Sequence, residues 1–83
     1  MQKYTEKQRK RGDNLKRKGT LKQLRLFAGM SRKELADELG KSVGTVRNWE
    51  IGMSQPNAND IVKLEQVLNM KWADVILVQK DLS

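Results

Sequence analysis

Apolar residues recur every three or four positions in four stretches of the chain between Thr20 and Leu68. This spacing places apolar side chains on one face of a helix and leaves polar side chains on the other face. A fifth stretch, about Trp72–Leu77, carries Val75 and Ile76, which are expected to pack back onto the other helices. The pattern predicts an all-α fold of five short helices. The repeating apolar positions of the first four are Leu21, Leu24, Ala28, Leu35, Ala36, Leu39, Val43, Val46, Trp49, Ile61, Leu64, Val67 and Leu68.

Capping residues mark where these helices begin and end. Serine, threonine or asparagine precedes each of the first four stretches, and three of these N-cap residues have a polar partner three positions later. The N-caps and partners are Thr20 with Gln23, Ser31 with Glu34, Asn57 with Asp60, and Ser42 alone. Gly29, Gly40 and Asn69 are expected to end helices, because glycine and asparagine tolerate the left-handed conformation. The predicted helices therefore run from Thr20 to about Gly29, then Ser31–Leu39, Ser42–Ile51, Ala58–Leu68 and Trp72–Leu77.

Two short helices joined at a glycine, as predicted for Ser31–Trp49, fit a helix-turn-helix motif. The motif continues into Trp49-Glu50-x-Gly52-x-x-x-Pro56, which is its most specific part. On these residues the chain resembles the lambda-repressor-like (Xre-type) family of helix-turn-helix DNA-binding domains, from about Thr20 to Ile76. The resemblance implies a five-helix domain whose helix 42–51 enters the major groove of double-stranded DNA.

The resemblance also implies which residues of that helix face the bases. They are Ser42, Val43, Gly44, Thr45, Arg47 and Asn48. Asn48 can pair with adenine, Arg47 with guanine or a phosphate, and Val43 can meet a thymine methyl group or simply belong to the core. Gly44 has no side chain, so it either lets the backbone approach a base pair or leaves that pair unread. Because this face has few base-reading groups, we expect affinity to depend on phosphate contacts and DNA shape.

Phosphate contacts are expected at the start of the positioning helix, in the loop after the recognition helix and in the basic N-terminal segment. The candidates are Ser31, Arg32, Lys41, Ser54, Gln55, Asn57, Lys16, Arg17 and Lys18. Arg32 is unfavourable for the helix dipole unless a phosphate lies nearby. Lys41 departs from the family, which usually has a buried valine or isoleucine there. Its stem could cover the apolar gap while its ammonium reaches a phosphate.

The family pattern further implies a partly buried ion pair between Arg25 and Glu50, which would tie the first helix to the end of the recognition helix. Two independent surface charges are the alternative. Glu65 is a second departure, because the family has a small residue at this position. Glu65 is expected either to face outward or to pair with a cation of the first helix.

The chain has 83 residues and a net charge of +7, and the charge is unevenly distributed. Residues 1–20 contain eight lysines and arginines against two acidic residues, a net charge of +6 that leaves +1 for residues 21–83. With few apolar side chains, residues 1–19 are predicted to form a flexible basic arm that lies along phosphates. A solubilising tail is the alternative. The domain is expected to span 20–77, followed by a short tail, 78–83.

Cysteine and histidine are both absent. The sequence therefore offers no thiol nucleophile, no cysteine or histidine metal ligand and no histidine base, and we expect no enzymatic activity, metal or cofactor. No apolar run approaches the ~20 residues of a membrane span. We expect a cytoplasmic transcriptional regulator that binds double-stranded DNA as a homodimer and acts as a repressor. The resemblance suggests a bacterium or phage as its source.

Two other functions remain open. One is a protein-interaction module, antitoxin-like or coactivator-like, which would use the same fold to hold a partner protein. The other is non-specific nucleic-acid binding driven by the basic arm. The continuous apolar run Val75–Val78 either closes the core or forms a dimer or partner surface.

Overall fold

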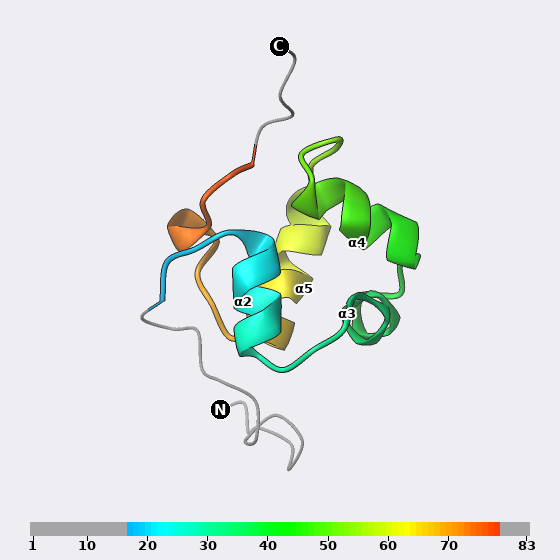
Figure 1. Ribbon diagram of the computed structural model, residues 1–83, viewed down its shortest axis with the longest axis horizontal. Helices are drawn as coiled ribbons and strands as arrows, with labels where there is room; N and C mark the ends of the chain where they lie inside the picture. Colours follow the sequence, from blue (N-terminus) through cyan, green and yellow to red (C-terminus); the bar gives the residue numbers. More distant parts are fainter. Residues whose placement is uncertain (1–16, 79–83) are drawn as a thin grey trace.

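The computed structural model describes residues 17–78, and these residues fold into four α-helices followed by one short 3-10 turn. The helices are α2 (Leu21–Phe27), α3 (Arg32–Leu39), α4 (Val43–Glu50) and α5 (Ala58–Leu68), and the turn is η1 (Trp72–Asp74). Figure 1 shows α3 end-on, α4 above it, and α5 behind α2. α3 packs against both α4 and α5, and α2 contacts α4. The fold is therefore all-helical in its described part, as the apolar pattern predicts.

The predicted N-caps of these four helices are confirmed. Capping boxes form at the starts of α2, α3 and α5, where the cap side chain and the third helical residue exchange hydrogen bonds with each other's backbone. Ser42 caps α4 by accepting a hydrogen bond from the Thr45 N–H. At the other ends, Gly40 (φ 67°) and Asn69 (φ 50°) adopt the left-handed conformation, which stops α3 and α5. Local chemistry thus determines the ends of the helices that carry the site.

One core joins all four helices. Its largest fully buried side chains include Leu24 of α2, Leu35 of α3, Val46 of α4 and Leu64 of α5. Ala36 is also fully buried, where a small side chain allows α3 to pack closely against its neighbours. The remaining buried apolar residues are Leu21, Ala28, Met30, Leu39, Trp49, Leu68 and Met70, with Val67, Trp72 and Val75 packed against them.

The predicted fifth helix, Trp72–Leu77, is wrong. Only η1 forms, and the backbone is extended at Val75 (φ −81°, ψ 126°). Gly19 pairs with Val75 in a parallel β-bridge, and the Ile76 N–H donates to the Gly19 oxygen at 2.8 Å. The β-branched side chains of Val75 and Ile76 suit this extended backbone better than a helix. Pairing with the N-terminal segment therefore replaces the helical hydrogen bonds.

Glu65 does neither of the two things expected of it. Its Oε2 accepts a hydrogen bond from the Trp72 N–H at 2.9 Å, and the side chain is half-buried. It therefore holds the start of η1 against the C-terminal part of α5.

Most of the predicted basic arm lies outside the described residues, including Lys16 and everything before it. The described end of the arm is in contact with the helical body. The Arg17 guanidinium carbon lies 3.3 Å from the centre of the Phe27 ring, a cation–π contact at the end of α2. Gly19 is buried in the bridge to Val75. Of the predicted tail only Val78 is described, so the domain boundaries stay predictions.

Candidate nucleic-acid interface

The recognition helix α4 has one buried and one accessible side. Val46, Trp49 and Glu50 are buried, and they fix the rotation of the helix about its axis. Ser42, Val43, Gly44 and Arg47 are exposed, and Thr45 and Asn48 are half-buried. Val43 is 44% exposed, so the alternative that it belongs to the core is wrong. The six predicted base-reading residues thus lie at the N-cap and along the accessible part of α4.

The first turn of α4 is held by side-chain hydrogen bonds. Ser42 Oγ accepts from the Thr45 N–H at 3.1 Å, and the two hydroxyl groups lie 2.9 Å apart. These bonds engage both hydroxyl groups within the protein. Within the described chain, the side chains of Arg47 and Asn48 make no such bond, and their donors are available to a ligand.

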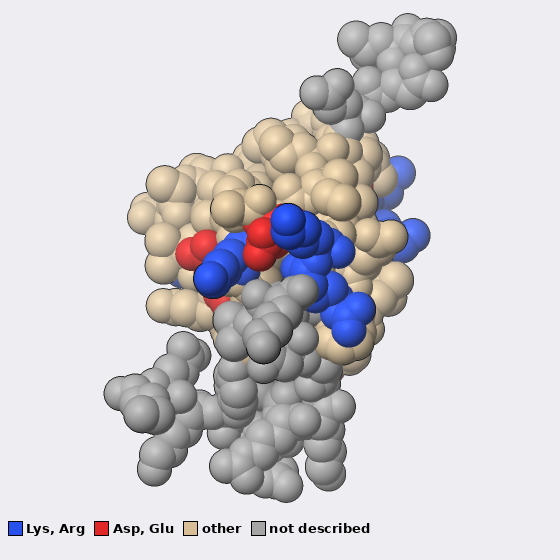
Figure 2. Space-filling view, turned by 90° about the vertical axis from the view of Figure 1, so that its left-hand side faces the viewer, with Lys and Arg blue, Asp and Glu red and all other residues tan. Residues whose placement is uncertain are grey.

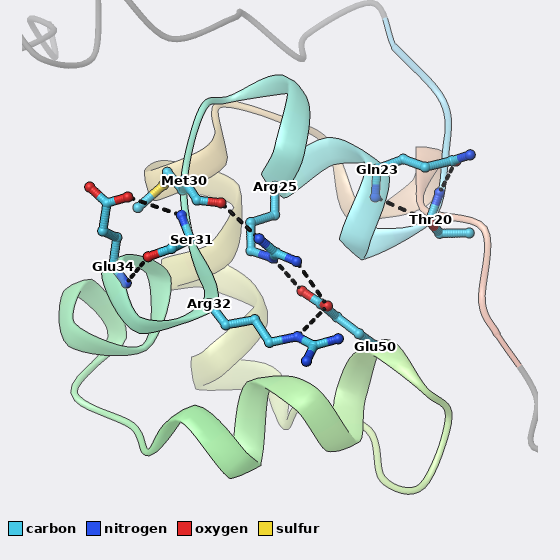
Figure 3. A network of polar contacts seen from close by, with 8 residues as sticks. All are labelled: Thr20, Gln23, Arg25, Met30, Ser31, Arg32, Glu34 and Glu50. Carbon is cyan, nitrogen blue, oxygen red and sulfur yellow. Dashed lines mark hydrogen bonds and ion pairs between the residues drawn. The ribbon is translucent and has the colours of Figure 1, made fainter.

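The structure brings together the predicted pair of Arg25 and Glu50. Arg25 Nε donates to Glu50 Oε2 at 2.6 Å, and the two side chains are only 6% and 1% exposed. The same guanidinium also donates to Glu50 Oε1 at 3.2 Å and to the Met30 carbonyl oxygen at 2.8 Å. The contact therefore links α2, the turn before α3 and the end of α4 (Figure 3).

A second arginine shares the same carboxylate, which the sequence reasoning missed. Arg32 Nε donates to Glu50 Oε1 at 2.9 Å, and the Arg32 side chain is 32% exposed. Arg32 is the first residue of α3 and was expected only to meet a phosphate. The sequence carries one sign of this shared contact, namely two arginines near the ends of helices and one glutamate in the Trp49-Glu50 run. Residue spacing alone does not reveal which of these cations meets the carboxylate.

Lys41 also forms an ion pair within the protein. Its Nζ lies 3.2 Å from Asp60 Oδ1, and the side chains are 34% and 8% exposed. Asp60 Oδ2 accepts from the Asn57 N–H, so the same carboxylate helps to cap α5. Lys41 therefore ties the turn before α4 to the start of α5. The half-buried placement of its side chain agrees with a stem that covers the gap left by the missing apolar residue.

The remaining predicted phosphate contacts lie at the surface. Ser31, Ser54, Gln55 and Asn57 are exposed, as are Arg17 and Lys18. Ser31 Oγ and Asn57 Oδ1 accept hydrogen bonds in the capping boxes of α3 and α5. The loop after α4 is fixed to it, because the N–H groups of Met53 and Ser54 both donate to the Asn48 carbonyl oxygen.

Figure 2 views the molecule from the side on which α2 and η1 lie in Figure 1. Lysine and arginine side chains gather near the centre of this face, with acidic side chains between them. The helical body therefore presents mixed charge here rather than a uniformly basic surface.

Residues 17–78 contain no group of three acidic, cysteine or histidine side chains that could hold a metal ion. In the same part of the chain, no helix is long and apolar enough to cross a membrane.

Comparison with known proteins agrees with the geometry. The sequence model of a helix-turn-helix family matches residues 21–75, which include α2 to α5 and η1. No curated protein and no solved structure matches the chain. The matched family is one of DNA-binding regulatory domains, which are not typically enzymes. The capped α3–Gly40–α4 unit and the Arg25–Glu50 contact agree with this match, which covers most of the chain. The chain therefore belongs to the Xre/lambda-repressor-like helix-turn-helix family.

Proposed function

We propose that this protein is a sequence-specific regulator that binds double-stranded DNA with α4 in the major groove and represses transcription by occupying its operator. The observation that carries the proposal is the arrangement of α4. Its accessible part presents the side chains of Val43, Arg47 and Asn48 around Gly44, while Val46 and Trp49 hold the other side in the core. A rigidly held helix with free polar side chains can read base edges.

Phosphate contacts would fix the orientation of α4 in the groove. Ser31 and Arg32 lie at the start of α3, and Ser54, Gln55 and Asn57 lie in and after the loop that follows α4. All five are at least partly exposed. Contacts to the backbone on both sides of a helix set its register without reading sequence. The side chains on α4 would then supply the specificity.

We further propose that two copies bind one operator as a symmetric dimer. Ile76 and Leu77 are 57% and 56% exposed on the extended C-terminal segment, and they form a candidate contact between copies or with another protein. A symmetric dimer of such domains places two recognition helices about one helical turn of DNA apart. A palindromic operator is the expected consequence.

Selection from a random pool tests this function directly. The full chain is incubated with a randomised duplex pool at about 150 mM salt, where weak electrostatic binding is screened, and the retained duplexes are sequenced. The proposal predicts an enriched, roughly palindromic motif. Retention of duplexes without an enriched motif would contradict specific reading, and retention of no duplex would favour a protein-interaction module.

Non-specific binding through the basic arm is the second candidate, because residues 1–20 carry +6 of the total charge of +7. It predicts equal affinity for all duplexes and a steep dependence on salt. Deletion of residues 1–16 separates the two candidates while it keeps Arg17 on Phe27 and Gly19 in its bridge. If the arm only adds affinity, the deletion variant selects the same motif as the full chain. If the arm is the binding site, the variant retains no duplex at this salt concentration.

A further inference from the structure

The Glu50 carboxylate is shared by two guanidinium groups, and this sharing leaves positive charge uncompensated. The Glu50 side chain is 1% exposed, and Arg25 and Arg32 both donate to it. One negative charge therefore faces two positive charges between α2, α3 and α4 (Figure 3). In a partly desolvated position such an excess attracts an anion more strongly than the same charge does in open water.

The two arginines are used differently. Arg25 is buried and donates from Nε and both Nη atoms to Glu50 and to the Met30 carbonyl oxygen. Arg32 donates only from Nε, and its two Nη groups make no hydrogen bond or ion pair within the described chain. Its side chain is 32% exposed. Every nitrogen of the Arg25 guanidinium is thus used in contacts within the protein, whereas the two Nη groups of Arg32 are available to a ligand.

The available end of Arg32 borders a shallow, open depression between α2 and the start of α3. Lys22, Arg25 and Arg32 supply its charged lining, beside Ser31, Leu26 and Met30. Lys22 is exposed on α2 and has no ion-pair partner in the described chain. With Glu50 as the carboxylate behind them, these three cations leave a net positive charge at the depression.

We propose that Glu50 is a positioning residue that presents Arg32 to a DNA backbone phosphate, and that Lys22 is a second contact to the same phosphate. The bond to Glu50 fixes the plane of the guanidinium, and a guanidinium held in this way can donate two parallel N–H bonds to phosphate oxygens. Lys22 adds a point charge from α2. The same carboxylate that anchors the end of α4 thereby orients a contact at the start of α3.

This inference rests on the proposed function, because it assumes that the start of α3 faces DNA. It goes further in assigning Lys22 to the interface and in giving Glu50 a role in binding as well as in folding. Free inorganic phosphate has the same chemistry as the backbone group. It serves as an independent probe that requires no recognition of a base sequence.

The first test compares the salt dependence of DNA binding for the full chain and for Arg32→Gln. The slope of log K against log salt is expected to become shallower by about 0.9, the value for one lost phosphate contact on duplex DNA. Between about 50 and 200 mM salt, the affinity of the variant then falls about 3-fold less than that of the parent. Lys22→Gln is expected to reduce the slope by a similar amount. Lys63→Gln, which removes the same charge from an exposed position on α5, should leave the slope unchanged.

An unchanged slope in Arg32→Gln, with the unfolding temperature lowered, would overturn the proposal, because Arg32 would then only stabilise the fold. If Arg32→Gln does not fold, Arg32→Lys takes its place. This variant keeps the charge but loses the planar fork, so it should keep the slope and weaken affinity several-fold. Parental affinity in Arg32→Lys would contradict the oriented contact. All slopes are measured on a scrambled duplex as well, so a lack of sequence preference counts against the proposed function and not against this site.

The second test uses phosphate alone. Replacing chloride by inorganic phosphate at equal ionic strength should raise the unfolding temperature of the parent more than that of Arg32→Gln or Lys22→Gln. Lys63→Gln should respond like the parent. An equal response in all four proteins would mean that phosphate acts through the solvent, and would overturn the site.

Discussion

The buried C-terminal end and the accessible side of α4 differ in burial and in ion pairing. At the C-terminal end, Trp49 and Glu50 are buried, and the Glu50 carboxylate is bound by two arginines from other helices. On its accessible side, Val43, Gly44 and Arg47 are exposed, and Arg47 makes no ion pair within the described chain. Substitutions at the buried C-terminal end should therefore change mainly stability, whereas substitutions on the accessible side should change which bases are read.

The largest effect is expected for Glu50→Gln. It leaves the buried Arg25 guanidinium without a counter-charge, and loss of one partner of a buried pair costs about 3–5 kcal/mol in the free energy of unfolding. Urea unfolding followed by circular dichroism measures the change. Glu38→Gln makes the same substitution at an exposed position on α3, and should change stability by less than about 0.5 kcal/mol.

Equal stabilities for Glu50→Gln and Glu38→Gln would contradict the view that the C-terminal end of α4 anchors the helix. It would mean that the two arginines find compensation elsewhere.

The second effect concerns binding rather than stability. Asn48→Ala should weaken binding to the selected duplex by about 1–3 kcal/mol, the value of one amide contact to a base, and should barely change binding to a scrambled duplex. Asn59→Ala, at an exposed position on α5, is the matched control and should leave both affinities unchanged. Equal losses on both duplexes would make Asn48 a backbone contact. Fluorescence anisotropy with labelled duplexes gives all the affinities.

The smallest expected effect is that of Gly44→Ala, which should change stability and DNA affinity in opposite directions. Gly44 lies inside α4, and an added Cβ would meet only Ser42 Oγ, at 3.9 Å. Gly44→Ala should therefore stabilise the fold by about 0.5–1 kcal/mol, because alanine is the better helix former. If the backbone of α4 approaches a base pair at this point, the same variant should bind the selected duplex more weakly.

Gly40→Ala is the informative contrast to Gly44→Ala. Gly40 has φ +67°, which an alanine adopts only with strain of about 1–2 kcal/mol. It should destabilise the fold where Gly44→Ala stabilises it. A gain in stability with unchanged affinity at Gly44 would show that the base pair facing it is not approached closely.

Local signals in the sequence were sufficient to predict where the helices that carry the site begin. Thr20, Ser31, Ser42 and Asn57 cap helices as predicted, because capping depends on residues three or four positions apart. The apolar period likewise identifies most of the core. The family resemblance added the contact between Arg25 and Glu50, which lie 25 positions apart.

Features that depend on distant parts of the chain could not be read in the same way. The segment after η1 is extended because Gly19 pairs with Val75, and no local pattern identifies that partner. The second arginine on Glu50 and the contact of Lys41 with Asp60 depend on how α3, α4 and α5 pack. A carboxylate attracts any nearby cation, so the sequence narrows the candidates without choosing among them.

The central claim is that the accessible part of α4 reads bases, and a comparison of selected motifs tests it most directly. The full chain and Arg47→Ala are each used to select duplexes from the same random pool at about 150 mM salt. Arg47 is exposed, so its loss should leave the fold intact. We predict that the variant selects the same motif except at one base pair in each half-site, where the preference is lost. Identical motifs with and without Arg47, together with an identical result for Asn48→Ala, would contradict the assignment of this part of α4 as the reading surface.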